Sequence, residues 1–351
     1  MPTLRDIGKN LGLSPATVSR ALNGFPEVNE RTRRRIQEMA HQLDYKPNQL
    51  ARKLVMGRSG MIGLVIKKPQ DLATDTTFFG VVTGLSACLA ERDLDLVLHV
   101  AVDEDEVAPY RRLISKGAVD GFLLNAPTIN DPRIAYLEEH KVHFAVHGRS
   151  DAEATYPYYD IDNKQVTVLA ASLLCDLGHR RIALLNGPAE RSYAVDRRAG
   201  FVETLASRKV HTPEDFIMAG PLNEHHGYVS ALRALSGALG PAPTAFVCAS
   251  TLIAVGVMRA VADLELQVPQ DISVIAHDDG IPQVRAASFS PSLTVTRSPL
   301  TDACAPLAEI IIALTQSAVP PHSLQRVGVP AFIIGGSTGP ARSGQTDAWT
   351  V

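Results

Sequence analysis

The stretch that most constrains the fold is LSPATVSRALNG, residues 13–24. The preceding segment, TLRDIGKNLG, carries apolar residues at helical spacing, and Gly12 is expected to end that helix. Ser14 followed by Pro15 predicts a second helix, because serine caps helix starts and proline is tolerated in the first turn. Its inward side chains would be Val18, Ala21 and Leu22. A helix, a glycine turn and a capped helix with a small, polar, basic outer face predict a helix-turn-helix.

A third amphipathic helix is predicted over residues 30–43, ERTRRRIQEMAHQL, and could close a three-helix core. An ordinary helical hairpin packed into a larger core is the alternative. The charge distribution argues against it, since residues 1–60 hold eleven Lys and Arg against five Asp and Glu, whereas the rest holds 23 against 32. A basic head on an acidic body is typical of a DNA-binding module joined to another domain. We therefore predict a DNA-binding headpiece over residues 1–46.

Residues 47–60 are predicted to link this headpiece to the rest of the chain. Pro47 ends the third helix, and Asn48 can cap a short new one. Gly57 and Gly60 would end it. An isolated helix of about ten residues is marginal in water, so we expect a coil until DNA orders it. A flexible linker with incidental cations is the alternative.

From residue 61 onward, short apolar strands alternate with amphipathic helices. This βαβ alternation predicts parallel sheets with helices on both faces. The strands are too many for one modest sheet, so we predict two similar doubly wound lobes, the second starting near residue 162. No GxGxxG or GxxxxGK[ST] motif follows any strand. The predicted strands are MIGLVI, LDLVLHV, VDGFLLN, VHFAVHG, RIALLNG, TAFVCAS, ISVIAHD and LTVTR, and the predicted helices lie near 79–92, 104–116, 130–140, 163–177, 191–208, 224–237, 251–264 and 300–317.

Ligands of open α/β sheets bind at the carboxyl ends of the strands, so polar residues after these strands are candidate contacts. The strand ends supply Asn125, His147, Gly148, Arg149, Asn186, Arg197, Ser250, Thr251, Asp278 and Asp279. This set suits a polyhydroxylated ligand, because a carboxylate accepts from two hydroxyls while a guanidinium donates to oxygens. No nucleophile–base pair stands out, so the chain is predicted not to be an enzyme.

Several positions have a simpler structural interpretation. One arginine of Arg197–Arg198 is expected to be solvated, and one acid of Asp278–Asp279 to cap a loop; we predict that Arg197 and Asp278 bind the ligand. His179 in LGHRR is interpreted as a structural turn residue.

Metal and hydrolytic sites are not predicted. His225–His226 could suggest a metal pair, but adjacent helical residues point apart and no third ligand has sensible spacing. A triad of Ser250, His277 and Asp278 lacks a GxSxG elbow. No cofactor is predicted.

The segments VSRALNG, PEVNERTRRRI, YKPNQLARKL and MIGLVI follow one another at a spacing that resembles the LacI/GalR family of transcriptional repressors. DIDNKQVTVLAASLLCDLGHRRIALLNGP, VDRRAGF and HDD extend the resemblance to about residue 338. It implies a homodimer on a pseudo-palindromic double-stranded DNA operator, controlled by an effector between two lobes similar to periplasmic sugar-binding proteins. It also implies three crossovers: lobe one from 61–161 and 292–322, lobe two from 162–291 and 324–338. The tail, 339–351, is predicted to be disordered.

The resemblance also implies roles for individual residues. Pro15, Ala16 and Arg20 occupy base-reading positions, and Arg20 is the best candidate for a guanine contact. Leu54 would wedge between base pairs in the minor groove. The remaining predicted DNA contacts, mostly to phosphates, are Ser14, Thr17, Ser19, Asn23, Asn29, Thr32, Tyr45, Asn48 and Ala51. The predicted effector contacts are Phe79, Asn125, His147, Arg149, Arg197, Ser250 and Asp278.

The class of effector is less constrained. NGFPEVNE and VHGRS resemble the α-glucoside-responsive subgroup, so we predict a sugar. Ser250-Thr251 stands where relatives commonly have Asn-Asp, which leaves the ligand's identity open. A purine or other aromatic ligand, acting as a corepressor, is the alternative, and it should require more stacking residues than Phe78 and Phe79 supply.

The remaining features predict a cytoplasmic protein that joins the nucleoid when bound to its operator. Cys88, Cys175, Cys248 and Cys304 form no CxxC pair and sit in apolar runs, as free thiols of a reducing compartment do. MPTLRDIG is no signal peptide, and no apolar run reaches the length of a membrane span.

Overall fold

The computed structural model describes residues 2–22, 25–45, 58–67, 76–102, 104–151, 153–316 and 319–342. The chain divides into two compact units, residues 1–59 and 60–351. Each unit is described by itself. No helix within the described ranges is long and apolar enough to cross a membrane.

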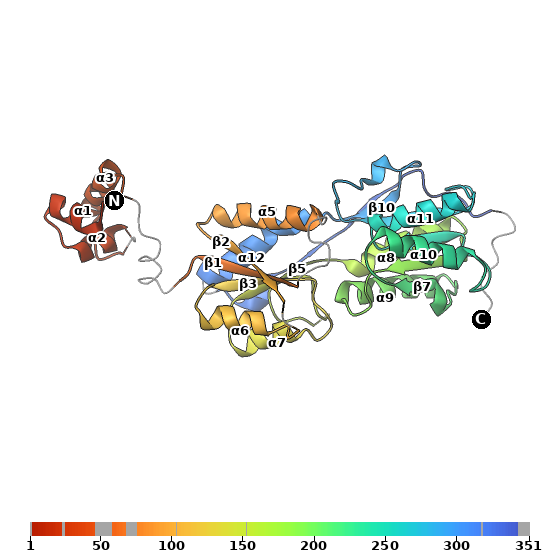
Figure 1. The fold of residues 1–351 in the computed structure, drawn as a ribbon, viewed down its shortest axis with the longest axis horizontal. Helices are drawn as coiled ribbons and strands as arrows, with labels where there is room; N and C mark the ends of the chain where they lie inside the picture. The colour runs from red at the N-terminus through yellow and green to blue at the C-terminus, as the bar shows by residue number, and fades with distance from the viewer. Residues whose placement is uncertain are drawn as a thin grey trace. The chain divides into compact units, whose positions relative to one another are not determined.

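The described part of the first unit consists of helices (Figure 1). They are α1 (Leu4–Leu11), α2 (Pro15–Leu22) and α3 (Glu30–Gln42). Thr3 caps α1 in a reciprocal capping box with Asp6, and Gly12 ends the helix in the left-handed conformation at φ 67°. The predicted helix-turn-helix is therefore confirmed, and the third helix ends one residue earlier than predicted.

A small apolar core holds these helices together. Ile7 from α1, Val18 from α2 and Ile36 from α3 are fully buried. The turn is tight, because a Cβ on Gly8 would lie 2.5 Å from the carbonyl oxygen of Leu13. The linker predicted over 47–60 falls outside the described residues except for residues 58–60.

Lobe one of the second unit contains a parallel sheet in the order β11-β5-β4-β3-β1-β2. Its strands are β1 (Met61–Lys67), β2 (Asp95–Ala101), β3 (Gly121–Asn125), β4 (Phe144–His147), β5 (Tyr158–Ile161) and β11 (Gln325–Gly328). Its helices are α5 (Thr76–Ala90), α6 (Ala108–Ser115), α7 (Pro132–Glu139) and α12 (Cys304–Gln316).

Alternate residues of these strands face opposite layers of helices. Leu64 and Leu123 pack with α5 and α12, whereas Phe122 and Phe144 pack with α6 and α7. Figure 1 shows α5 on one side of the sheet and α6 and α7 on the other. Because both faces are covered, the strands read as continuous apolar runs, and this made them recognisable in the sequence.

Lobe two repeats this architecture in the order β12-β10-β9-β8-β6-β7, in which only the described β10–β12 pair is antiparallel. Its strands are β6 (Ile182–Asn186), β7 (Ile217–Ala219), β8 (Ala245–Cys248), β9 (Ser273–Asp278), β10 (Thr294–Arg297) and β12 (Ala331–Ile333). Its helices are α8 (Asn163–Asp176), α9 (Ser192–Ser207), α10 (Glu224–Leu235) and α11 (Thr251–Asp263). Short 3-10 helices lie at Glu214–Phe216, Ala286–Ser288, Leu300–Ala303 and Pro321–Ser323.

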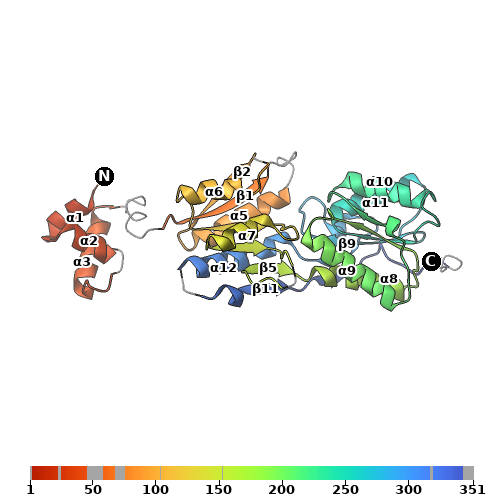
Figure 2. The ribbon, with the colours of Figure 1, turned by 90° about the horizontal axis from the view of Figure 1, so that it is seen from below.

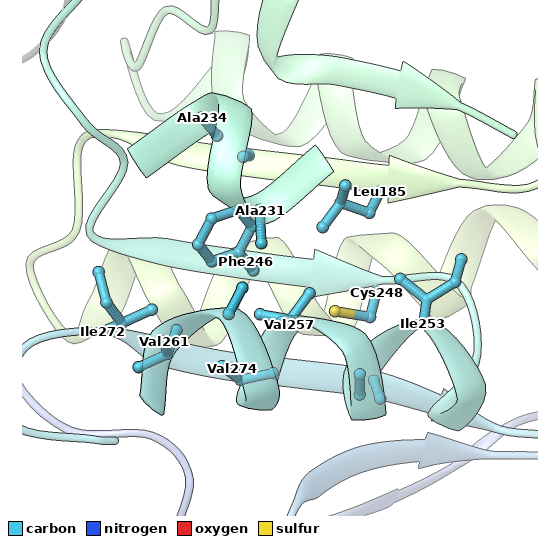
Figure 3. Packing of buried hydrophobic residues seen from close by; sticks show 14 of the residues in the cluster. Leu185, Ala231, Ala234, Phe246, Cys248, Ile253, Val257, Val261, Ile272 and Val274 are labelled. Carbon is cyan, nitrogen blue, oxygen red and sulfur yellow. The ribbon is translucent and has the colours of Figure 1, made fainter. Parts of the chain in front are cut away.

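The core of lobe two is built mostly from small and branched side chains. Figure 2 shows α10 and α11 on one side of the sheet and α8 and α9 on the other. In Figure 3, Phe246 of β8 lies between Ala231 of α10 and Val257 of α11. The helices α10 and α11 approach so closely that a Cβ on Gly227 would lie 2.1 Å from the carbonyl oxygen of Ile253.

The crossover positions correct the predicted lobe boundaries. Residues 292–322 were assigned to lobe one, but β10 pairs with β9, so its strand completes the sheet of lobe two before the chain crosses to α12. The resemblance assigns residues 324–338 to lobe two, but β11 pairs with β5 of lobe one, and the chain rejoins lobe two from β12 onward. The strands β5, β7, β11 and β12, of three or four residues each, were not predicted.

The tail also begins later than predicted. Gly339 accepts a hydrogen bond from a ring nitrogen of His179 at 3.0 Å, and the Ala341 amide donates to the Leu177 carbonyl at 2.9 Å. His179 is buried and also contacts Thr244 and Ser273 through its ring nitrogens, so it connects three segments of lobe two. The prediction of disorder is therefore wrong for residues 339–342; residues 343–351 lie outside the described ranges.

The close α10–α11 contact gives a stability prediction. A Cβ on Gly256 would lie 2.1 Å from the backbone carbonyl oxygen of Glu224, so Gly256→Ala must separate the helices. We expect a loss of roughly 1–3 kcal/mol in the free energy of unfolding, measured by urea denaturation. Gly80→Ala is the matched control, because its Cβ would meet only Thr301 at 3.6 Å. Equal stability of both variants would contradict this packing.

Candidate functional site

The helix α2 presents the predicted base-reading residues to solvent. Pro15, Ala16 and Arg20 are exposed, whereas Val18 and Ala21 on the opposite face are buried. The outer face is thus small and carries one cation, which is the surface that the sequence pattern predicted.

Several predicted phosphate contacts also have local roles. The Ser14 hydroxyl accepts from the Thr17 amide at 3.1 Å, and the Asn29 side chain accepts from the Thr32 amide at 2.8 Å. These bonds satisfy orphan amides at the starts of α2 and α3. Ser19 and Tyr45 are half-buried. Asn23, Asn48, Ala51 and Leu54 lie outside the described residues, and the DNA contacts of the whole set stay predictions.

A cavity of about 230 Å³ lies between the strand ends of the two lobes. It contains the predicted residues Asn125, His147 and Arg197. Lobe one contributes the ends of β3 and β4, and lobe two contributes α9 and the end of β9, as expected for sheets of this class. The other polar or aromatic lining residues are Tyr159, Asp160, Asn163, Ser192, Tyr193, Asp279 and Ser298.

The lobes contact each other beside this cavity. The Arg191 guanidinium donates to the Ala126 carbonyl, and the Ser192 hydroxyl donates to the Pro127 carbonyl at 3.2 Å. Thr128 and Arg191 form an isolated antiparallel bridge. Backbone of both lobes therefore contributes to one binding site.

Arg197 is the central cation of the cavity and is 4% exposed. Its Nε donates to the Asn163 side-chain oxygen at 3.0 Å, and its Nη1 donates to the Ala249 carbonyl at 2.8 Å. The Tyr193 ring lies 5.1 Å from the guanidinium carbon. Burial lowers the pKa of Arg197 from its ordinary value, while the negative charge of Asp279 opposes that shift. By contrast, Arg198 forms an exposed ion pair with Glu214, which agrees with the prediction that one of these two adjacent arginines is solvated.

His147 supplies a neutral hydrogen-bonding group. Burial lowers the pKa of its imidazole to about 4, so the ring carries no charge at neutral pH. A neutral imidazole has one donor and one acceptor nitrogen, which suits a hydroxyl group.

The structure reverses the expected roles of the two adjacent acids. The Asp278 carboxylate accepts from the Gly280 amide at 2.8 Å and pairs with Arg297, and it lines a different cavity. Asp279 lines the cavity of Arg197 instead, with a side chain that is 13% exposed. Asp278 therefore does not line the cavity of Arg197, because its carboxylate is held by Gly280 and Arg297, and its contact with the effector stays a prediction.

Burial raises the pKa of Asp279 to about 7, and Arg197 opposes that rise. The His277 Nε2 atom approaches Asp279 to 3.4 Å. Burial lowers the pKa of His277 well below its ordinary value, so this approach is not an ion pair. Asp279 thus titrates near neutral pH beside a permanently charged guanidinium.

Three other predicted effector contacts do not line the cavity. Ser250 is the N-cap of α11 and accepts from the Ile253 amide at 3.3 Å. Phe79 is 68% exposed. Arg149 donates to Asp160 at 2.8 Å and acts on the cavity wall, not on the cavity itself. For Ser250 and Arg149 the cause is the same, since the rule of strand ends locates a loop but not the direction of its side chains. Phe79 was expected from the family resemblance alone.

The alternatives with metal or hydrolytic chemistry find no support in the described geometry. No group of three or more candidate ligands gathers among the described residues, and His226 contacts Ser230 on its own helix. The ring of His277 contacts Thr296, not Ser250.

The sequence analysis missed several lining residues. Asp160 and Asn163 lie in the DIDN segment, which was noted as a motif but not as a contact, because β5 was not recognised as a strand. Tyr193 and Ser192 begin α9, where the helix N-terminus turns toward the cavity. In DIDNKQ an acidic residue stands near the end of a strand that a helix follows, and this order could have indicated Asp160 as a lining residue.

The fold and the cavity define a class of protein: a helix-turn-helix headpiece followed by a two-lobed ligand-binding domain. Residues 3–48 match the family described as bacterial regulatory proteins, lacI family, and residues 171–338 match the periplasmic binding protein-like domain. The HTH-type transcriptional regulator AglR of Rhizobium meliloti (strain 1021) is 40% identical over 342 residues, which cover 96% of this chain and 94% of that protein. This chain belongs to the LacI family of transcriptional regulators.

Other relatives and solved structures agree with this assignment. The HTH-type transcriptional repressor PurR of Klebsiella pneumoniae (strain 342) is 30% identical over 85% of this chain and 86% of that protein. A transcriptional regulator CelR–cellobiose complex superposes with a TM-score of 0.71 at 26% identity, covering 96% of this chain and 100% of that one. The lac repressor dimer bound to operator and the anti-inducer ONPF has the same fold, with a TM-score of 0.76 at 23% identity over 96% and 99% of the two chains.

The reassigned acid gives a pH-dependent prediction. Because the pKa of Asp279 is about 7 in the folded chain and about 4 when unfolded, the folded state binds more protons between these values, and stability falls as pH rises through that window. Asp279→Asn should therefore raise the melting temperature relative to wild type more at about pH 8 than at about pH 5. Asp278→Asn, which weakens the pair with Arg297, should lower it at both. A lower melting temperature of Asp279→Asn, most marked at the higher pH, would contradict the buried position of this carboxyl.

Proposed function

We propose that this LacI-family regulator represses transcription by binding a pseudo-palindromic operator as a homodimer, and that an uncharged sugar in the inter-lobe cavity releases it. The observation that carries the proposal is the cavity itself, where Asn125, His147 and Asp279 from strand ends of both lobes converge with Arg197 of α9. The proposal includes no catalytic step, cofactor or metal, and it places the protein in the cytoplasm with its DNA.

The charges of the cavity favour an uncharged ligand. Arg149 is paired with Asp160, His147 is neutral, and Asp279, with a pKa of about 7, offsets part of the charge of Arg197 near neutral pH. A phosphate or carboxylate ligand would need an uncompensated cation, because burying an unpaired charge costs several kcal/mol. Hydroxyl groups, which both donate and accept, suit these mixed partners.

The sugar class is supported by relatives and by local sequence. NGFPEVNE and VHGRS resemble the α-glucoside-responsive subgroup, and the similarity to AglR over nearly the whole chain fits that subgroup. CelR, whose structure was solved with cellobiose, has the same fold at 26% identity. We therefore propose an α-glucoside.

Release would follow from one shared equilibrium. A sugar held by both lobes favours one relative position of the lobes, and a dimer reads two half-sites only when its headpieces are correctly spaced. Effector and operator then oppose each other with reciprocal coupling. In this proposal the segment around Leu54 is ordered on operator DNA and acts as the apolar wedge.

A purine or other aromatic effector is the second candidate, supported by the 30% identity to PurR. The rings among the described lining residues are His147, Tyr159 and Tyr193, and Tyr193 already packs beside Arg197. Exposed Phe79 adds no stacking surface to the cavity. A ligand of this kind that tightened operator binding would make the protein a corepressor-dependent repressor.

A ligand panel tests the effector class directly. The panel, added to the full-length chain, consists of maltose, methyl α-D-glucoside, cellobiose, inosine and guanine. Binding to the folded state must raise the melting temperature. A ligand at a hundred times its dissociation constant adds about 2.7 kcal/mol to the free energy of unfolding. We expect shifts with the α-glucosides, followed by loss of operator binding in fluorescence anisotropy. A shift with the purines alone would replace the sugar by the second candidate.

The base-reading role of α2 gives a separate prediction. Arg20→Ala should reduce discrimination between the operator and random DNA by roughly 1–3 kcal/mol, while non-specific binding persists. The control is Arg34→Ala, because Arg34 lies on α3 in an exposed pair with Glu30. Equal weakening of binding to all DNA by Arg20→Ala would mean that Arg20 contacts phosphates and reads no base.

A further inference from the structure

A continuous chain of hydrogen bonds runs through the wall of the cavity. The Arg197 Nε donates to Asn163 Oδ1 at 3.0 Å, and Asn163 Nδ2 donates to Asp160 Oδ1 at 3.1 Å. On the other oxygen of that carboxylate, Asp160 Oδ2 accepts from Arg149 Nε at 2.8 Å. Donors and acceptors alternate along these bonds, and Asn163 Nδ2 also donates to the Ile161 carbonyl at 3.3 Å, so three partners determine the orientation of the Asn163 amide.

This chain of contacts crosses from one lobe to the other. Arg149 follows β4 and Asp160 lies in β5 of lobe one, whereas Asn163 begins α8 and Arg197 lies on α9 of lobe two. The backbone between Asp160 and Asn163 is itself the first connection of the two lobes. The side-chain bonds therefore run parallel to a covalent crossover.

Most side chains in this series of hydrogen bonds are buried, so each bond is important for keeping its polar groups paired. Asp160 and Asn163 are 5% and 3% exposed, and only the Arg149 end is partly open, with a side chain that is 21% exposed. Burial raises the pKa of Asp160 while the hydrogen bond and charge of Arg149 oppose the rise, so the carboxylate depends on this guanidinium. The Arg149 Nη2 also approaches Asp196 of α9 to 3.9 Å.

The ligand would bind at the Arg197 end of this series of hydrogen bonds. Within the described residues, the Nε and Nη1 of Arg197 are hydrogen-bonded to Asn163 and Ala249, and its Nη2 makes no hydrogen bond. The direction of Nη2 is set by the two bonds that hold the planar guanidinium. A change at Asn163 would rotate this plane and misdirect the remaining donors.

We propose that Arg149 and Asp160 of lobe one, with Asn163 of lobe two, are positioning residues of the effector site, which hold the Arg197 guanidinium toward the ligand. Arg149 does not line the cavity and acts on Arg197 through Asp160 and Asn163. Ligand contact at Arg197 and the relative position of the lobes are then linked through one set of bonds. This inference rests on the proposed function.

Arg149→Gln is the most informative change, since Arg149 lies outside the cavity and at the partly exposed end of the chain. Removing it leaves the buried Asp160 carboxylate without its cation, which should weaken binding of maltose or methyl α-D-glucoside by roughly five- to hundredfold in calorimetric titration of the full-length chain. Asp160→Asn is the second variant. A loss of binding in this variant would mean that Arg149 acts on Arg197 through Asp160 and not through Asp196. Arg198→Gln is the matched control, because Arg198 pairs only with exposed Glu214.

A double-mutant cycle separates positioning from a general structural role. In an Arg197→Lys background the guanidinium to be positioned is gone, so Arg149→Gln should weaken binding by much less than in wild type. A merely structural role would give the same fold loss in both backgrounds and an altered melting temperature without ligand.

The outcomes distinguish the two proposals. Wild type that binds neither α-glucoside would overturn the proposed sugar effector, and this inference with it. Wild type that binds while Arg149→Gln binds equally well would overturn the positioning role alone. If Asp160→Asn does not fold, Arg149→Gln and the cycle still decide the question.

Discussion

A cation buried between two lobes must find partners in the protein, and Arg197 finds them for its Nε and Nη1 atoms. An isolated buried charge costs several kcal/mol, so its position must be stabilised by hydrogen bonds and an opposing carboxylate. Asn163 and the Ala249 carbonyl supply the bonds, and Asp279 supplies the charge. The cavity is organised around this requirement. Because Asn163 is in turn held by Asp160 and Arg149, the requirement extends from lobe two into lobe one.

The two parallel sheets explain why such a site can exist at all. Helices cover both faces of each sheet, so a ligand can approach it at the loops that follow the strand ends. Where the strand ends of two such sheets share one cavity, a ligand can touch both lobes at once. The energetic consequence is that affinity for a ligand and the arrangement of the lobes cannot vary independently. A regulator of transcription needs this property.

The headpiece follows a different physical logic. Its core is small, with Ile7, Val18 and Ile36 as its fully buried centre, and its helix ends are capped by Thr3 and Asn29. Local hydrogen bonds thus contribute a large share of the order in a unit that buries little apolar surface. The exposed side of α2, where DNA recognition is predicted, and the inter-lobe cavity thus belong to different compact units.

The sequence by itself determined the class of fold, the helix-turn-helix, the long buried strands and the loops in which ligand contacts lie. These features are local, since helix caps, glycine turns and runs such as GFLLN act within a few residues of the chain. Only the tertiary structure decided which of two adjacent acids enters the cavity, that Ser250 caps α11 and that Arg149 pairs with Asp160. It also decided where the chain crosses between lobes, because the pairing of β10 with β9 and of β11 with β5 joins residues far apart in sequence. Neighbouring side chains on a loop differ in direction by backbone angles that depend on the packing around them, and no periodicity in the sequence records those angles.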